Sequence, residues 1–95
     1  MDPLETFLVG YFNQDFDLIF GEPEDVVRAF GRTTPAVVAA ARDGVIELLR
    51  TFGDDQALLD ETLRIGSEYQ PDDPRELREL LEYAVTHWAA AESRL

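Results

Sequence analysis

The sequence predicts an all-α fold, a small single-domain bundle of about five short helices that spans residues 1–95. Three observations predict it. Apolar residues recur at spacings of three and four along most of the chain, which is the period of an amphipathic helix. The periodic stretches begin beside Pro, Asp or Thr, and most of them end at Gly, as helices commonly do. Strand patterns are nearly absent, and only residues 17–20 have the composition of one.

The composition is that of one compact core. The hydrophobic share of 45% and the aromatic share of 11% are higher than a disordered acidic tail would have. There is no cysteine, which removes disulfides, thiolate nucleophiles and cysteine-based zinc sites. The N-terminal segment carries two acids and no base, unlike a signal peptide, and no apolar run approaches the length of about 20 residues that spans a membrane. We expect cytoplasmic residence.

The chain is strongly acidic. Twenty acids face eight bases, all of them arginine, and the formal net charge is −12. Phosphate backbones and anionic lipid headgroups repel such a chain, so we expect it to bind neither nucleic acid nor membranes. A basic protein partner would be attracted to it. The alternative is that the acidity serves only solubility or adaptation to salt.

The first helix is predicted over residues 3–14. Asp2 is its N-cap, Pro3 takes the first helical position, and Glu5 completes the spacing of a capping box. Its apolar face is formed by Leu4, Phe7, Leu8, Tyr11 and Phe12.

Residues 15–21 combine two acids with an apolar triplet, which predicts a helix end followed by an extended or turn segment. A second helix is predicted over residues 22–31. Three carboxylates, Glu22, Glu24 and Asp25, lie in its first turn, where they complement the helix dipole.

The third helix begins at Thr34 and Pro35 and ends at Gly53. Gly44 in its middle lowers helix propensity and indicates a close crossing with another helix. Its buried stripe is Val38, Ala41, Val45, Leu48, Leu49 and Phe52.

The fourth helix begins after Asp54 or Asp55 and ends at Gly66, and a fifth is capped by Asp73. The fourth buries Leu58, Leu59, Leu63 and Ile65. The fifth buries Leu77, Leu80, Leu81, Ala84, Trp88 and Ala91.

The residues of a catalytic site are missing. The sequence has no nucleophile paired with a base, no metal-ligand cluster and no glycine-rich phosphate loop. The one histidine, His87, lacks a second histidine or a cysteine at ligand spacing, so the pattern favours a flanking or interface residue over a metal ligand. We expect no enzyme activity.

Acidic residues between 15 and 24 provide oxygen ligands of the kind that calcium prefers. Their spacing departs from the EF-hand loop, because Gly21 is the seventh residue from Asp15 rather than the sixth. We therefore predict no metal and no other cofactor.

Residues 11–17, YFNQDFD, place three aromatic and two acidic side chains in seven positions, and a short acidic helix ending in Phe30 follows. This pattern resembles the immunity proteins of bacterial contact-dependent growth inhibition (CDI) systems, small acidic helical proteins with a tyrosine-phenylalanine-x-glutamine-aspartate-aromatic-aspartate motif. Asn13 stands where that motif has histidine, and Phe16 stands where tryptophan is common. The resemblance covers residues 7–30, and the C-terminal half is similar only in length and helical pattern.

The resemblance implies that the protein binds the toxic C-terminal domain of a delivered effector and blocks it in the cell that makes both. Such toxin domains are often nucleases with basic clefts, which the charge of −12 would suit, with carboxylates lying where phosphates would bind. We expect the partner to be this cognate toxin domain. The residues expected to contact it are Asp15, Asp17, Glu22, Glu24 and Asp25. For Asp15 and Asp17 the alternative is a structural role, in which the side chains bind nearby backbone amides.

Other interpretations stay open. The acids Asp54, Asp55, Asp60 and Glu61 form a second candidate surface, which the sequence does not rank against the first. The protein could instead be an interaction module unrelated to toxins, such as an antitoxin, an anti-sigma-like regulator or an adaptor, or a metal-dependent enzyme. The sequence does not decide between a monomer and a homodimer, in which Trp88 and the alanine-rich end of the last helix would form a shared face.

Overall fold

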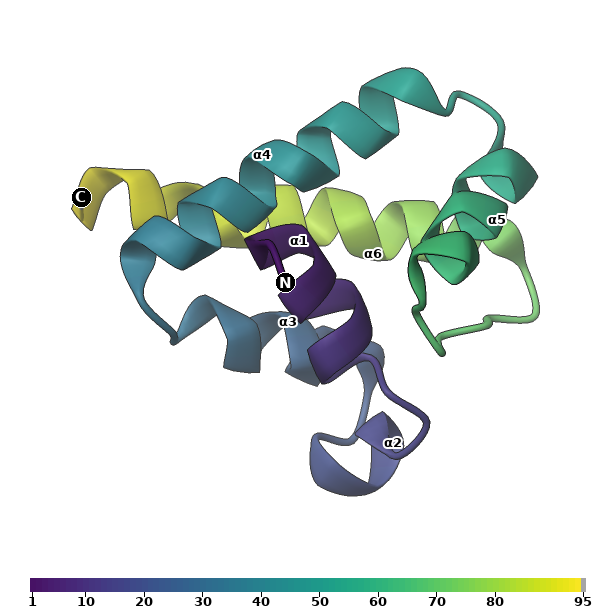
Figure 1. Ribbon diagram of the computed structural model, residues 1–95, viewed down its shortest axis with the longest axis horizontal. Coiled ribbons are helices and arrows are strands. Elements are labelled where there is room, and N and C mark those ends of the chain that lie inside the picture. The colour runs from purple at the N-terminus through teal and green to yellow at the C-terminus, as the bar shows by residue number, and fades with distance from the viewer. Residues whose placement is uncertain (95) are drawn as a thin grey trace.

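The computed structural model describes residues 1–94, which are helical apart from short connections (Figure 1). The elements are α1 (Pro3–Glu5), η1 (Thr6–Tyr11), α2 (Phe16–Ile19), α3 (Pro23–Gly31), α4 (Pro35–Thr51), α5 (Asp55–Ile65), α6 (Pro74–His87) and η2 (Trp88–Arg94). Here η1 is a π-helical turn that continues α1, and η2 is a 3₁₀ segment that continues α6. The described residues contain no strand, so the all-α prediction is confirmed.

Most helix starts follow the predicted caps, but the side chain of Thr34, the predicted cap of α4, makes no cap hydrogen bond. The side chains of Asp2, Asp54 and Asp73 each accept a hydrogen bond from a backbone N–H of the first turn, over 2.9 to 3.0 Å. Each bond satisfies a donor that has no partner within its helix. Pro3 and Pro74 take the first helical position, where the missing N–H costs nothing.

The first helix differs from the prediction in its geometry and its end. It ends at Tyr11 rather than near residue 14, and its second half is π-helical. The Phe12 N–H donates to the Phe7 carbonyl, five residues earlier, at 3.3 Å. In an α-helix, side chains five residues apart would point about 140° apart. The wider turn lets both Phe7 and Phe12 enter the core, where their rings meet edge to face with centroids 5.2 Å apart.

The helix α2 forms where the sequence predicts an extended or turn segment, so that prediction is wrong. The Phe20 N–H donates to the Phe16 carbonyl at 2.8 Å and closes the turn. Phe16 packs against Phe12 and Tyr69, while Phe20 stacks on Tyr11. The contact of Phe16 with Tyr69 comes from a distant part of the chain, and tertiary packing of this kind overrides weak local propensity.

The helix α6 lies in the middle of the fold and packs against α3, α4 and α5 (Figure 1). The side chains predicted to be buried on the last helix are all buried: Leu77, Leu80, Leu81, Ala84, Trp88 and Ala91. Trp88 is therefore part of this chain's own core, and it is not available to a face shared with a second copy.

The predicted close crossing at Gly44 is confirmed. A Cβ atom added at Gly44 would lie 3.1 Å from Cβ of Leu4, which is closer than ordinary van der Waals contact. The missing side chain of α4 thus allows the N-terminal helix to lie directly against it.

Gly66 ends α5 in a backbone conformation that favours glycine. Its φ is +126°, and an added Cβ would lie 3.2 Å from Cγ2 of Val9. We expect Gly66→Ala to lower the free energy of unfolding by about 1–3 kcal/mol, as measured by urea denaturation. Gly53→Ala is the matched control, because an added Cβ there meets no atom within 4 Å. Equal losses in the two variants would exclude backbone strain as the cause.

Candidate functional site

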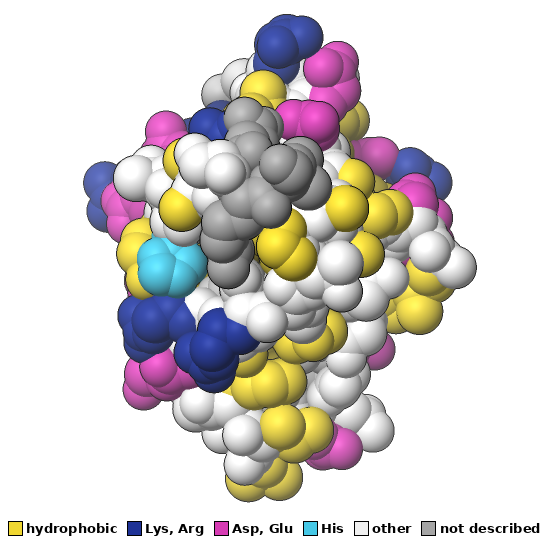
Figure 2. Space-filling view, turned by 90° about the vertical axis from the view of Figure 1, so that its left-hand side faces the viewer, with side chains coloured by type: hydrophobic (Ala, Val, Ile, Leu, Met, Phe, Trp, Pro, Cys, Tyr) yellow, Lys and Arg dark blue, Asp and Glu magenta, His cyan; other side chains and the backbone are white. Residues whose placement is uncertain are grey.

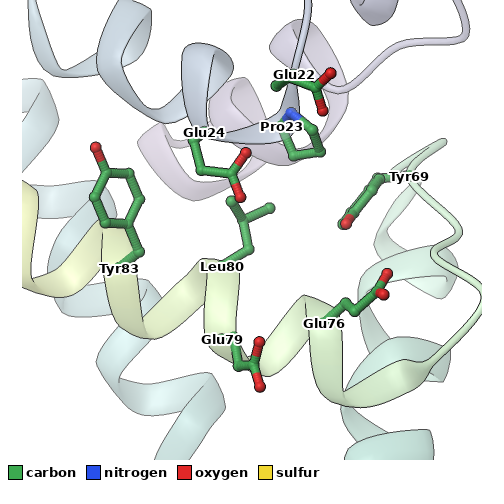
Figure 3. A pocket seen from close by; sticks show the side chains of 8 residues that line it. All are labelled: Glu22, Pro23, Glu24, Tyr69, Glu76, Glu79, Leu80 and Tyr83. Carbon is green, nitrogen blue, oxygen red and sulfur yellow. The ribbon is translucent and has the colours of Figure 1, made fainter.

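An acidic hollow of about 460 Å³ opens between the start of α3, the segment before α6 and one side of α6 itself (Figure 3). Its walls combine carboxylates with two tyrosine rings, and the aliphatic side chain of a buried leucine lies between them. The lining residues are Glu22, Pro23, Glu24, Tyr69, Glu76, Glu79, Leu80 and Tyr83.

Local helix structure positions the carboxylates on the two sides of this acidic hollow. On α3, Pro23 begins the helix, and the Glu22 N–H donates to the Asp25 carboxylate at 2.9 Å, which fixes the first turn. On α6, Glu76 and Glu79 are three residues apart and therefore lie on the same side of the helix. The contact between α3 and α6 brings the two pairs of glutamates together.

Negative charge in the hollow is poorly compensated. Within residues 1–94, the carboxylates of Glu24 and Glu76 take part in no hydrogen bond and no ion pair. Glu79 approaches Arg75 at 3.6 Å, a distance at which an exposed pair contributes little. The acidic hollow therefore carries a surplus of negative charge that a cationic group from outside could neutralise.

Tyr83 is held in place from α3. The Arg28 guanidinium donates to the Tyr83 hydroxyl at 3.1 Å and also pairs with Asp25. Arg28 therefore fixes the ring of Tyr83 at the edge of the acidic hollow. The carboxylate that it neutralises, that of Asp25, does not line the hollow.

Tyr69 reports the electrostatic potential of the hollow. Burial raises the pKa of the Tyr69 phenol to about 12, with further contributions from the negative charges of Glu76, Glu24 and Glu22. Each of these effects disfavours the phenolate. The same negative potential would favour a cationic side chain at this position.

The raised pKa of Tyr69 predicts a loss of stability at alkaline pH. The unfolded chain loses this proton near pH 10, whereas the folded protein retains it until about pH 12. Because the folded state binds more protons in that window, the contribution to stability is complete below pH 10 and falls as the pH rises to about 12. We expect the difference in phenolate absorbance between the wild type and Tyr69→Phe to show one transition centred near pH 12.

A second variant tests the cause. Glu76→Gln should move the transition of Tyr69 to lower pH, because Glu76 is the largest of the charged contributors. A transition that stays in place would mean that burial alone raises the pKa of Tyr69.

The structure separates the acids predicted to bind the partner. Glu22 and Glu24 line the acidic hollow. Asp25 does not, because it accepts from the Glu22 N–H and pairs with Arg28, and these two contacts hold the pKa of Asp25 below its usual value. Asp15 directly precedes α2 and Asp17 lies in its first turn; both are exposed, and one Asp17 oxygen accepts only from the adjacent Leu18 N–H at 3.0 Å. Their role in binding stays a prediction.

All four carboxylates of the second candidate surface accept hydrogen bonds from groups of the same chain. The donors are the Ala57 backbone for Asp54, Arg78 for Asp55, Gln56 for Asp60 and Arg64 for Glu61. Arg78 and Arg64 therefore neutralise Asp55 and Glu61, whereas Asp54 and Asp60 bond to uncharged donors and keep their negative charge.

Sequence reasoning missed half of the hollow. The residues it did not single out as site residues are Tyr69, Glu76, Glu79 and Tyr83. The last three recur at spacings of three and four along α6, beside its buried stripe. That spacing places them on one side of the helix, but only the fold shows that the start of α3 faces it.

The lining of the hollow is suited to binding cationic groups. Carboxylates form strong charge-assisted bonds with guanidinium and ammonium groups, and tyrosine rings attract cations. Among the described side chains, no group of three His, Cys, Asp or Glu residues could hold a metal ion.

No helix within residues 1–94 has the length and hydrophobicity needed to cross a bilayer.

On the face seen in Figure 2, Asp and Glu side chains lie around the edges, and the visible middle is hydrophobic, basic or uncharged. The histidine on this face is His87, whose ring stacks on Tyr83 with centroids 5.4 Å apart. Its position beside an aromatic ring at the surface agrees with the flanking or interface residue predicted from the sequence.

The model of one protein family matches residues 1–87, and its description is CdiI immunity protein. This finding confirms the resemblance seen in residues 7–30 and extends it over most of the chain. Neither the curated proteins nor the solved structures contain a match to this sequence.

Proposed function

Because the chain belongs to the CdiI immunity protein family, we propose that it neutralises a CDI toxin by binding a basic surface of the toxin domain at the acidic hollow. Immunity proteins of these systems protect the cell that makes the toxin. The protein would act in the cytoplasm of that cell, as an inhibitor without catalytic activity of its own.

One observation supports the choice of the hollow. It is a concave site where carboxylates of α3 and α6 converge, and Glu24 and Glu76 have no partner among the described residues. An arginine or lysine side chain of a toxin would find both ionic partners and the rings of Tyr69 and Tyr83 there.

We further propose that the toxin domain is a nuclease. A nuclease needs a basic cleft to hold the phosphates of its substrate. The glutamates of the hollow would occupy such a cleft in the place of phosphates, and the net charge of −12 would accelerate the encounter.

Calorimetric titration tests the proposed function. The titrant is the C-terminal domain encoded by the gene directly upstream, made in an inactivated form. We expect a one-to-one complex with a dissociation constant on the order of nanomolar, about −12 kcal/mol. Absence of heat with both partners folded would overturn the proposal and favour an interaction module unrelated to toxins.

A further inference from the structure

The helix α2 presents two aliphatic side chains to solvent. Leu18 is 83% exposed and Ile19 is 62% exposed, and within residues 1–94 the only other large hydrophobic side chain with such exposure is the terminal Met1. Single exposed hydrophobic residues are common on protein surfaces, whereas contiguous exposed apolar surface is typical of interaction sites. Figure 1 shows α2 at the end of the molecule, away from the central helices.

The exposure of Leu18 is imposed by the fold. Phe16 and Phe20 are four residues apart and share the inner side of α2, where they pack on Phe12, Tyr69 and Tyr11. Leu18 is two residues from each phenylalanine and therefore lies on the opposite side of the turn.

The connection that precedes α2 is also fixed. The Asn13 amide group donates to the Gly10 carbonyl at 3.1 Å, and its oxygen accepts from the Asp15 N–H at 2.9 Å. Both bonds are local, so the path from η1 to α2 does not depend on a partner. The tip formed by Leu18 and Ile19 is thus held in a defined position before any partner binds.

We infer that this α2 tip, Leu18 and Ile19, is the apolar anchor of the interface with the toxin domain, next to the acidic hollow. The inference rests on the proposed function and names a second part of the same interface. Tyr69 joins the two parts, because its ring packs on Phe16 behind the tip and also lines the hollow. The complementary surface of the toxin is an apolar pocket with basic residues around it.

The negative charge of the chain favours the toxin domain, rather than a second copy of the chain, as the partner of the α2 tip. The tip is flanked by the exposed acids Asp15, Asp17 and Glu22. Two copies meeting through their tips would bring these acids together, each on a chain of charge −12. A basic rim on the toxin would pair with them instead, since interfaces match opposite potentials.

The test compares two double variants in binding to the inactivated toxin domain, followed by biolayer interferometry at several salt concentrations. In Leu18→Ser/Ile19→Ser the tip loses its apolar surface, and we expect binding to weaken about 10- to 100-fold, mainly through faster dissociation. The control is Ala36→Ser/Ala40→Ser, which makes two exposed positions of α4 polar and should bind like the wild type. Both variants should keep the wild-type melting temperature, because the altered side chains are exposed.

Each other outcome overturns the inference. If the tip variant binds like the wild type, the tip lies outside the interface, while wild-type binding still supports the proposed function. Equal weakening in the control would show that loss of exposed apolar surface in general is responsible. A wild-type dimer that the tip variant alone converts to a monomer, with toxin binding unchanged, would identify a second copy as the occupant. If the wild type itself does not bind the toxin domain, the proposed function fails together with the inference.

Discussion

Replacing Trp88 by alanine is expected to lower the free energy of unfolding by about 3–5 kcal/mol, a large share of the stability of a small domain. Trp88 is 1% exposed, and its ring meets those of Phe7 and Phe30 at centroid distances of 4.7 and 5.1 Å. Its indole N–H donates to the Val27 carbonyl at 2.9 Å. The side chain therefore joins the C-terminal segment to both η1 and α3.

Trp88→Phe distinguishes the contribution of the hydrogen bond to stability from the contribution of the aromatic ring. It keeps an aromatic side chain against Phe7 but removes the bond to Val27, and we expect a smaller loss of about 1–3 kcal/mol. Urea denaturation followed by circular dichroism measures both variants, because fluorescence would disappear with the tryptophan. An alanine variant within 1 kcal/mol of the wild type would contradict the central position of this residue in the core.

Removing charge from the acidic hollow is expected to slow association with the toxin domain. In the triple variant Glu22→Gln, Glu24→Gln and Glu76→Gln, three carboxylates of the hollow become neutral while their shapes are kept. At low salt we expect the association rate constant to fall roughly 10-fold or more, because electrostatic steering raises such rates by one to three orders of magnitude. The difference from the wild type should shrink towards 1 M salt, where the screening length is about 3 Å.

A charge-matched control distinguishes the acidic hollow from net charge. Asp43→Asn, Glu47→Gln and Glu82→Gln remove the same number of charges from α4 and α6, at exposed positions that neither line the hollow nor belong to the second candidate surface. Equal slowing in both triple variants would mean that overall charge steers the toxin without a preferred landing site. Unchanged association in both would remove the electrostatic part of the proposal.

Much of the fold is predictable because its signals are local. Asp54 and Asp73 cap helices through bonds to amides two or three residues away, so their role is visible in the sequence. The apolar period of the last helix identifies Trp88 as buried for the same reason. The helix α2 is not predictable in this way, because its turn depends on Tyr69, which is far away in the chain and packs on Phe16.

The site is less predictable than the fold. The sequence identifies Glu22 and Glu24 as acids of the first helical turn. It does not show that this turn forms one wall of an acidic hollow, because the opposite wall is formed by α6. The hydrogen bonds within the second candidate surface are partly predictable from the sequence, since Arg64 follows Glu61 at helical spacing. The pairing of Asp55 with Arg78, 23 residues later, is visible only in the folded chain.

The π-helical turn of η1 gives the N-terminal helix one residue more than an α-helical path of the same shape would need. Deleting one residue between Phe7 and Phe12 would place the two rings four residues apart, so that α-helical bonding would hold them on the same face of the helix. The segments before and after the turn would then keep their orientation, with Leu4 on Gly44 and Phe16 on Tyr69. Within this family, we expect chains that are one residue shorter in this turn to have the same architecture, with an α-helical turn in place of the π-helical one.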